Sequence, residues 1–272
     1  MLRLRSILVL LLVGVVSLTA YNWSMVQEFL TPHKPLPGLE LVKVAPGKFS
    51  LTTLVPNSFG RQYFTKPVEI KHPFEISRYE ITIDQWNLCF KEGGCSHKAK
   101  QRRFEKGDFP VTNVTWFDTR DFTKWLSKRT GQNFRLPTEE EWSYAAFTGK
   151  DVTKAMIEKM IAEREEKAFT SAKKFRRTKK IGTFGKNKWG IYDTRGAVWD
   201  WTMTCRFPSD EANIRSISID KLKNPDLCSN RVVQGDERGH VPVFVGEVLS
   251  GGCGTGDPID HIGFRVVRDL TN

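Results

Sequence analysis

Tryptophan is the residue that most constrains how this chain can fold. The sequence of 272 residues contains eight tryptophans, and aromatic residues make up 11% of it. A buried indole ring needs close packing and an acceptor for its N–H group. Six tryptophans are therefore expected to fill the core: Trp116, Trp125, Trp142, Trp189, Trp199 and Trp201. With a hydrophobic content of 39%, the chain can build a sizeable core, which argues against wholesale disorder.

The N-terminal residues 1–29 are expected to be a targeting segment. Arg3 and Arg5 precede 21 residues without a charge, from Ser6 to Val26. This stretch has the composition of a signal peptide, and it is just long enough to span a bilayer as an uncleaved anchor. We favour the anchor over a cleaved signal because the candidate cleavage site at Ala20 is poor. Both alternatives place the bulk of the chain on the periplasmic side of the inner membrane, either anchored by residues 6–26 or released by cleavage.

Residues 30–39 contain three prolines and predict a short, stiff linker to a domain at 40–272. Within that domain the pattern predicts an α+β fold with many irregular loops. Strands are expected near 41–49, 68–70, 74–76, 231–233, 241–248 and 264–267. Helices are expected over 83–90, 115–129 and 151–167, with one more beginning at Thr138. Thr115 and Thr138 are the expected N-caps of their helices. The glycine-rich stretch 251–256 is expected to be a flexible loop.

The net charge of +11 is concentrated in one segment. Residues 150–180 hold eleven Lys or Arg against five Asp or Glu, which is more than half of the excess. In an exported protein, such a basic insertion favours an envelope protein partner or an anionic membrane surface, and not nucleic acid. The residues expected to make this contact are Lys173, Lys174, Arg176, Arg177, Lys179 and Lys180.

The five cysteines suggest two disulfides and one remaining thiol. In an oxidising compartment, cysteines pair where they can. Cys89 and Cys95 lie six residues apart around a Gly-Gly turn, and Cys205 and Cys228 can close a longer loop. Cys253 is then left over. The chain has no CxxC motif and no Cys/His cluster at zinc spacing, so a structural zinc site is not expected.

Three blocks carry a family resemblance. They are FPVTNVTWFD at 109–118, RLPTEEEWSYAA at 135–146, and NKWGIYD at 187–193 continuing to GAVWDWT at 196–202. In order and spacing they resemble the formylglycine-generating enzymes, or sulfatase-modifying factors, over residues 40–268. The resemblance implies a domain related to the C-type lectin fold. The blocks also have a structural interpretation, in which the tryptophans fill the core while Arg135 and Arg265 satisfy carbonyls and carboxylates.

In this family, two cysteines near the C-terminus bind copper and convert a substrate cysteine to formylglycine. The present sequence departs from that pattern in either of two alignments. One places Asp236 at the family's serine, and no cysteine follows until Cys253. The other places Cys253 itself on that serine. Neither supplies the pair of thiolates that suits Cu(I), so copper is not expected.

Calcium and other metals are also considered from the resemblance. Relatives carry a calcium loop where this chain has its basic insertion, which is a poor environment for a cation. A second calcium site resembles the turn 196–201, which makes Asp200 the candidate metal residue. Candidates for a different catalytic centre are Cys253, His240, His261 and Asp236, because two histidines and a carboxylate suit non-haem iron.

Two functions follow as the main expectations, and a purely structural subunit of an envelope assembly is a third possibility. The first is a non-catalytic periplasmic binding or regulatory module, a pseudoenzyme tethered to the membrane. The alternative is an oxygen-dependent oxidoreductase that modifies a protein or a siderophore-like substrate, as relatives of the non-haem iron type do.

Overall fold

The computed structural model describes residues 33–57, 60–100, 102–170, 178–194, 198–205, 228, 230–235, 250–254, 256 and 258–270. The chain divides into two units, Met1–Lys34 and Pro35–Asn272, and the following paragraphs concern the second. The expected targeting segment at 6–26 lies outside the described residues. In the part that is described, no helix combines the length and the apolar character needed to cross a bilayer.

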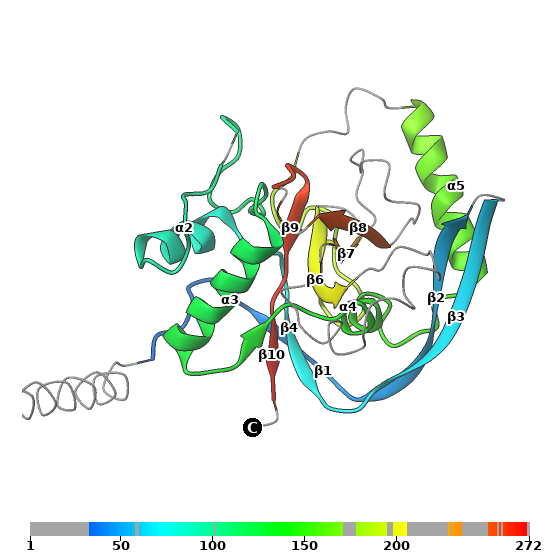
Figure 1. The fold of residues 1–272 in the computed structure, drawn as a ribbon, viewed down its shortest axis with the longest axis horizontal. Coiled ribbons are helices and arrows are strands. Elements are labelled where there is room, and N and C mark those ends of the chain that lie inside the picture. The colour runs from blue at the N-terminus through cyan, green and yellow to red at the C-terminus, as the bar shows by residue number, and fades with distance from the viewer. Residues whose placement is uncertain are drawn as a thin grey trace, which may run out of the picture. The chain divides into compact units, whose positions relative to one another are not determined.

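Two four-stranded sheets form the centre of the domain (Figure 1). The first has the order β1 (Leu41–Val44), β4 (Phe74–Ser77), β10 (Val267–Asp269) and β5 (Phe134–Arg135). The second has the order β8 (Ser250–Gly254), β7 (Asn230–Gln234), β6 (Trp199–Cys205) and β9 (Ile262–Phe264). Because β9 and β10 follow each other along the chain, the two residues between them, Arg265 and Val266, connect the two sheets.

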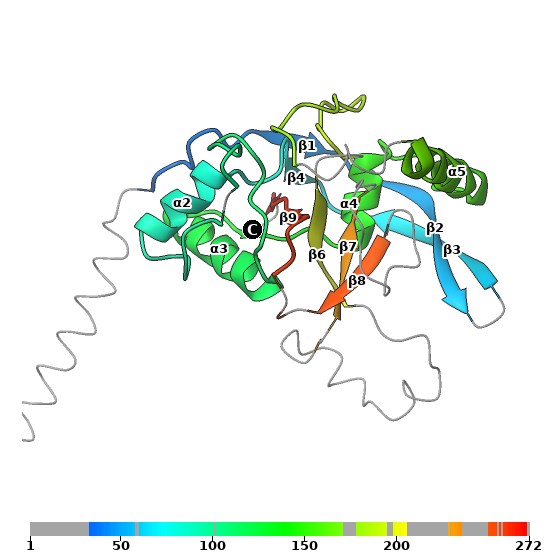
Figure 2. The ribbon, with the colours of Figure 1, turned by 90° about the horizontal axis from the view of Figure 1, so that it is seen from above.

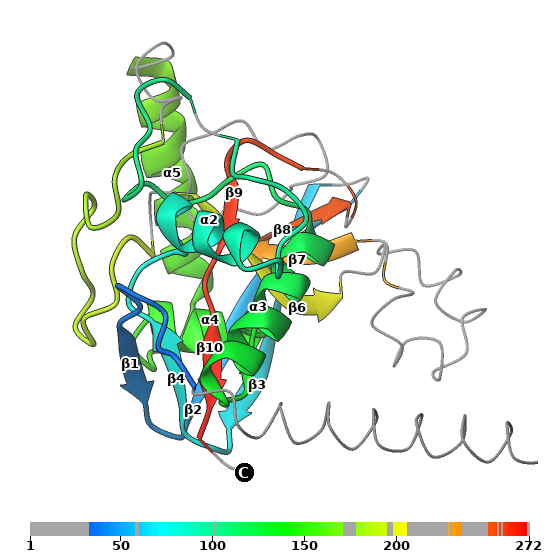
Figure 3. The ribbon, with the colours of Figure 1, turned by 90° about the vertical axis from the view of Figure 1, so that its left-hand side faces the viewer.

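Three helices begin with the same capping arrangement. They are α2 (Ile83–Lys91), α3 (Trp116–Thr130) and α4 (Glu139–Ala146), and each starts after a threonine whose hydroxyl accepts the N3 amide while the N3 side chain accepts the cap amide. This reciprocal bonding satisfies two helix-terminal donors at once. The expected caps Thr115 and Thr138 are thereby confirmed. Figure 3 shows α2 and α3 packed side by side against the sheets.

A long two-stranded ribbon and a fourth helix form the opposite part of the domain. β2 (Gly47–Asn57) pairs with β3 (Gly60–Ile70) in register over all eleven residues of each strand. The helix α5 (Lys154–Thr170) lies along this ribbon (Figures 1 and 2). Its buried residues Ile157, Met160 and Ile161 belong to the same apolar cluster as Phe49 and Leu51 of β2. The first half of the basic insertion is thus part of the folded core.

The tryptophans occupy the interior as the sequence predicts. Trp86, Trp116, Trp142, Trp199 and Trp201 are each at most 2% exposed, while Trp125 and Trp189 pack partly buried against the core. Indole N–H groups donate to main-chain oxygens of His97, Thr202 and Val114 and to the carboxylates of Glu92 and Asp200. The Trp199 N–H is buried and has no acceptor in the part of the chain that the structure describes.

Two expectations near the C-terminus are wrong. Residues 251–254 belong to β8, which pairs with β7, and are not a flexible loop. The single strand expected over 264–267 is two short strands, because the chain passes from one sheet to the other at Arg265. Gly263 allows this passage, since a Cβ atom there would lie 2.7 Å from the Val111 carbonyl oxygen. The strand expected at 241–248 lies outside the described residues.

Candidate functional site

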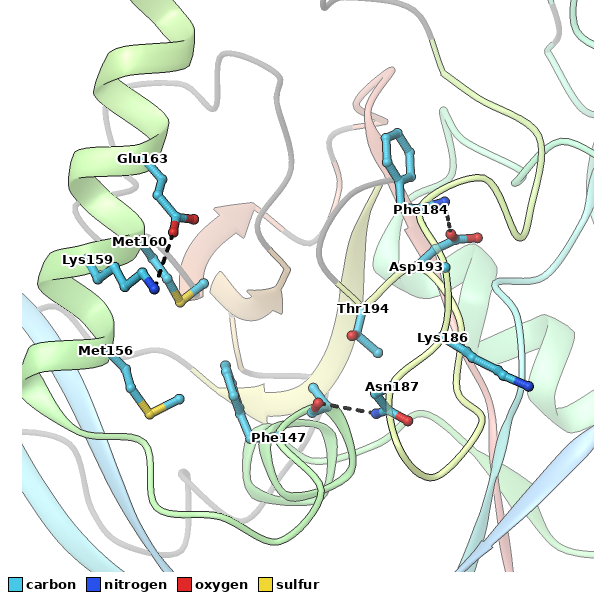
Figure 4. Close-up of a pocket in the computed structure, with 12 residues that line it drawn as sticks. Phe147, Met156, Lys159, Met160, Glu163, Phe184, Lys186, Asn187, Asp193 and Thr194 are labelled. Atoms are coloured by element: carbon cyan, nitrogen blue, oxygen red, sulfur yellow. Dashed lines mark hydrogen bonds and ion pairs between the residues drawn. The ribbon is translucent and has the colours of Figure 1, made fainter.

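A cavity of about 380 Å³ opens between α5 and the loop 184–194. Figure 4 shows α5 on one side, the end of α4 at the base, and the loop on the other side. Apolar side chains from three segments line it, namely Phe147, Met156, Met160 and Phe184. Methionine side chains are flexible and polarizable, so they adapt to ligands of different shape. The cavity is therefore suited to an apolar group.

The rim of this cavity carries polar groups. Lys159 and Glu163 lie one helical turn apart on α5, with 3.9 Å between Nζ and Oε1. Thr194 lies on the facing wall, whereas the Lys186 side chain points away from the cavity (Figure 4). An apolar interior with a few polar groups at the edge is the usual composition of a ligand or peptide site.

Asp193 fixes the loop that forms the facing wall. Its carboxylate accepts the backbone N–H of Phe184 at 2.7 Å and that of Gly182, which closes the loop on itself. Asp193 adopts a left-handed conformation with φ of 58°. Burial raises the pKa of its carboxyl group, and the two backbone donors oppose this effect. The loop is held in one shape before any ligand binds.

A buried charge cluster lies next to this wall. Arg265 is fully buried, and its Nε donates to Asp200 Oδ2 at 2.8 Å. Its Nη2 donates to the Tyr192 carbonyl at 2.7 Å and lies 2.8 Å from Glu80 Oε1. The same Asp200 oxygen accepts the Trp142 indole N–H at 2.8 Å. Arg265 thus connects both sheets to the loop that lines the cavity.

The cluster holds two carboxyl groups and one guanidinium. Burial raises the pKa of Glu80 to about 8, and the charge of Arg265 opposes that rise. Burial also raises the pKa of Asp200. Among the described residues, none besides Arg265 brings a donor to either oxygen of Glu80, whereas Asp200 accepts two hydrogen bonds. The proton therefore resides on Glu80, and Asp200 with Arg265 forms a neutral pair.

The expected disulfides are present. Cys89 and Cys95 are bonded, with 5.4 Å between their Cα atoms, and Cys205 is bonded to Cys228. The first bond joins the end of α2 to the turn that follows, and the second joins the end of β6 to Cys228, two residues before β7. All five cysteines fall within the described residues, and Cys253 is the one outside these two bonds.

The structure separates two of the four catalytic candidates, Cys253 and His261. Cys253 is in β8 and His261 directly precedes β9, and these are the two edge strands of one sheet. Three strand spacings correspond to about 14 Å, which is too far for a shared metal ion. Asp236 and His240 lie outside the described residues. His261 Nδ1 lies instead 3.0 Å from the Asp260 carboxylate, which lowers the pKa of Asp260.

The family's metals do not fit the residues present. Copper would need a second thiol beside Cys253, and the other four cysteines are in disulfides. Asp200, the candidate metal residue, contacts the Arg265 guanidinium, and a second cation there would meet a positive charge. In the ranges that the structure describes, no group of three or more His, Cys, Asp or Glu side chains could hold a metal ion.

Of the residues expected to contact a partner, Lys173, Lys174, Arg176 and Arg177 lie outside the described residues. Lys179 is exposed, and Lys180 forms a 2.6 Å ion pair with Asp108. No pattern of residues indicated the cavity between α5 and the loop 184–194. The residues that line it come from segments far apart in the sequence. Only the spacing of Met156 and Met160, four residues apart on α5, indicated an apolar face.

Comparison with known proteins agrees with this architecture. The structure titled "Structure of PvdO from Pseudomonas aeruginosa" aligns with a TM-score of 0.61 at 25% identity, covering 85% of this chain and 95% of that one. The bovine (Bos taurus) "Inactive C-alpha-formylglycine-generating enzyme 2" is 35% identical over 107 residues, which is 36% of this chain and 34% of the relative. The Mycobacterium tuberculosis "Formylglycine-generating enzyme" is 30% identical over 114 residues, 38% of this chain and 36% of the relative.

The fold defines a loop-rich, mixed α/β domain of the formylglycine-generating type. Residues 27–270 match the family described as "Sulfatase-modifying factor enzyme 1-like domain", and the chain belongs to that family. The matched region spans about a third of the length of the curated relatives. The expected family resemblance is therefore confirmed.

Proposed function

We propose that this chain is an exported, membrane-tethered binding or regulatory module, built on a formylglycine-generating-type domain that no longer carries out the oxidation. The observation that supports this proposal most is the state of the cysteines. Four are in disulfides, so Cys253 has no second thiol with which to bind copper. Two thiolates are the natural Cu(I) ligands. The similarity to a bovine relative named as inactive is in keeping with this proposal.

The absence of oxidation is tested directly. The purified full chain, loaded with Cu(I), is incubated with a cysteine-containing peptide of the sulfatase type. We expect no formylglycine by mass spectrometry and no oxygen uptake above that of the buffer, and the same result for Cys253→Ser. Turnover by the native chain that is lost in Cys253→Ser would contradict the proposal. Stoichiometric iron in the purified protein, with oxygen uptake, would instead support the alternative oxidoreductase.

The cavity beside α5 is the proposed binding site. It is formed by the basic insertion on one side and by the fixed loop 184–194 on the other. The proposed ligand is a partner protein of the envelope that inserts an apolar side chain between these methionines and Phe147.

A photo-crosslinking amino acid at position 159 tests this site in cells. Lys159 is exposed and lines the cavity. We expect one specific protein adduct, and Met156→Asp is expected to lower its yield about tenfold, because a carboxylate would be buried against the partner's apolar group. Glu158→Lys, one turn from Lys154 on the exposed side of α5, is the matched control and should leave the yield unchanged. An adduct that is insensitive to Met156→Asp would exclude the cavity.

A further inference from the structure

The loop that follows α2 carries a second concentration of positive charge. Between residues 98 and 108 there are five basic residues and two acidic ones. Lys98, Lys100, Arg103 and Lys106 are exposed, and no carboxylate of the described residues lies within ion-pairing distance of them. The fifth cation, Arg102, is paired with Asp260 at 2.5 Å.

The first half of this loop is held firmly to α2. The Cys89–Cys95 disulfide fixes its start. The Trp86 indole N–H donates to the His97 carbonyl at 2.9 Å, and the Ala99 amide donates to the Asn87 side chain at 3.0 Å. The positions of Lys98 and Lys100 along the surface are therefore set by the core of the domain.

The second half is closed by its own acidic residue. Glu105 is 6% exposed, and its carboxylate accepts the Arg102 backbone N–H at 2.8 Å. The Asp84 amide at the start of α2 donates to the Gly107 carbonyl at 3.0 Å. Because the Glu105 carboxylate points into the domain and binds the backbone, it does not form a surface ion pair with Arg103 or Lys106. Because the backbone that carries these cations is already ordered, little backbone freedom is lost when they bind.

The tertiary structure adds the end of the basic insertion to this loop. The Ile181 amide donates to the Asp108 carbonyl at 3.1 Å, and Lys180 pairs with the Asp108 carboxylate. Lys179 is exposed next to this junction and forms no ion pair with any of the described residues. Two segments about 70 residues apart in the sequence thereby form one surface, which we define as the basic surface: Lys98, Lys100, Arg103, Lys106, Lys179 and Lys180.

We propose that the basic surface binds the anionic headgroups of a lipid bilayer. This inference rests on the proposed tethering, because only eight residues lie between Val26, the end of the uncharged segment, and Pro35. Fully extended, this stretch of chain spans about 30 Å at most, so the domain would stay close to the bilayer. The Pro35 carbonyl accepts from Arg129 of α3, and the Pro37 carbonyl accepts from Gln85 of α2, the helix that also holds the basic loop.

Phe104 supports a lipid partner over an acidic protein. It is 39% exposed and stands between Arg103 and Lys106 in the sequence. Large apolar side chains flanked by cations are typical of surfaces that rest in the headgroup region of a membrane. Each Lys or Arg near an anionic surface strengthens the attraction, and the effect extends over about one Debye length.

Lysine footprinting of the full chain tests the surface. The protein is reconstituted in nanodiscs of phosphatidylcholine, or of phosphatidylcholine mixed with phosphatidylglycerol, and exposed amines are acetylated and quantified by mass spectrometry. On the anionic discs, acetylation of Lys98, Lys100, Lys106 and Lys179 is expected to slow about fivefold, the factor for one basic side chain near such a surface. High salt should remove this protection. Lys43, Lys48 and Lys71, which are exposed on other elements, serve as internal controls.

Charge variants complete the test. Replacing Lys98, Lys100, Arg103 and Lys106 by glutamine should abolish the protection of Lys179, whereas replacing Lys43, Lys48, Lys71 and Lys150 by glutamine should not. Equal acetylation on both kinds of disc, or protection that persists in high salt, would overturn the inference, as would protection by single-stranded DNA or an acidic protein in place of lipid. Tethering is measured separately by carbonate extraction. If carbonate releases the chain from the membrane, the proposed tether is wrong. In that case the same acetylation experiment, with vesicles added to the released protein, tests the basic surface independently of the tether.

Discussion

Replacing Arg265 by methionine is expected to lower the free energy of unfolding by about 3–5 kcal/mol, as measured by urea denaturation. The guanidinium is fully buried and pairs with Asp200. It also donates to the carbonyl groups of Arg78 and Tyr192. Removing it leaves the Asp200 charge in the interior without a counter-ion, together with two carbonyls that lose a donor. This is the largest effect that we expect from a single substitution in the chain.

Two comparisons separate the buried charge from simple loss of packing. Arg268→Met removes an ion pair with Glu75 in which both side chains are partly exposed, and it should cost less than about 1 kcal/mol. Combining Arg265→Met with Asp200→Asn and Glu80→Gln should recover part of the loss, because no charge then remains buried. If Arg265→Met were as mild as Arg268→Met, the cluster would not be a main stabilising element.

The stability of the protein is expected to fall as the pH rises from about 4.5 to about 8. The folded-state pKa of Glu80 is raised from its ordinary 4.5 to about 8 by burial. Between these two pH values Glu80 is protonated in the folded protein and ionised in the unfolded chain. Because the folded state then binds one more proton, the free energy of unfolding decreases as the pH rises. The contribution is complete below about pH 4.5 and is lost as the pH passes through about 8. Its size is on the order of a few kcal/mol.

Glu80→Gln is the variant that checks this prediction. Glutamine is uncharged at every pH, so the decline in the free energy of unfolding between pH 4.5 and 8 should flatten. Glu69→Gln is the matched control, because Glu69 is half exposed in its pair with Lys48, and this variant should keep the slope of the native protein. A native profile that is flat or rises over this range would show that Glu80 is ionised beside Arg265.

These expectations bear on function because the cluster adjoins the cavity. Arg265 holds the Tyr192 carbonyl, and the next residue, Asp193, closes the loop that faces α5. A change that loosens the cluster should therefore alter the wall of the cavity as well as the stability of the fold. Crosslinking at position 159 in the Arg265→Met background would reveal such a connection.

The sequence alone determined the local features of this protein. Threonines followed at the third position by a residue that can accept a hydrogen bond located the starts of α3 and α4, because capping depends on neighbours within one turn. The tryptophan-rich blocks identified the family and the large aromatic residues of the core, and the spacing of the cysteines suggested both disulfides.

Only the tertiary structure decided which distant residues meet. The sequence placed Cys253 and His261 among candidates for one centre, yet strand order puts them at opposite edges of a sheet. It suggested Asp200 as a metal residue, whereas Arg265, at the crossing between the two sheets, forms an ion pair with Asp200. The joining of the loop that follows α2 to residues 180–181 likewise depends on contacts at Asp108, whose carbonyl accepts the Ile181 amide and whose carboxylate pairs with Lys180. Strand order and loop contacts arise from packing between segments far apart in the chain, and no local pattern of residues records them.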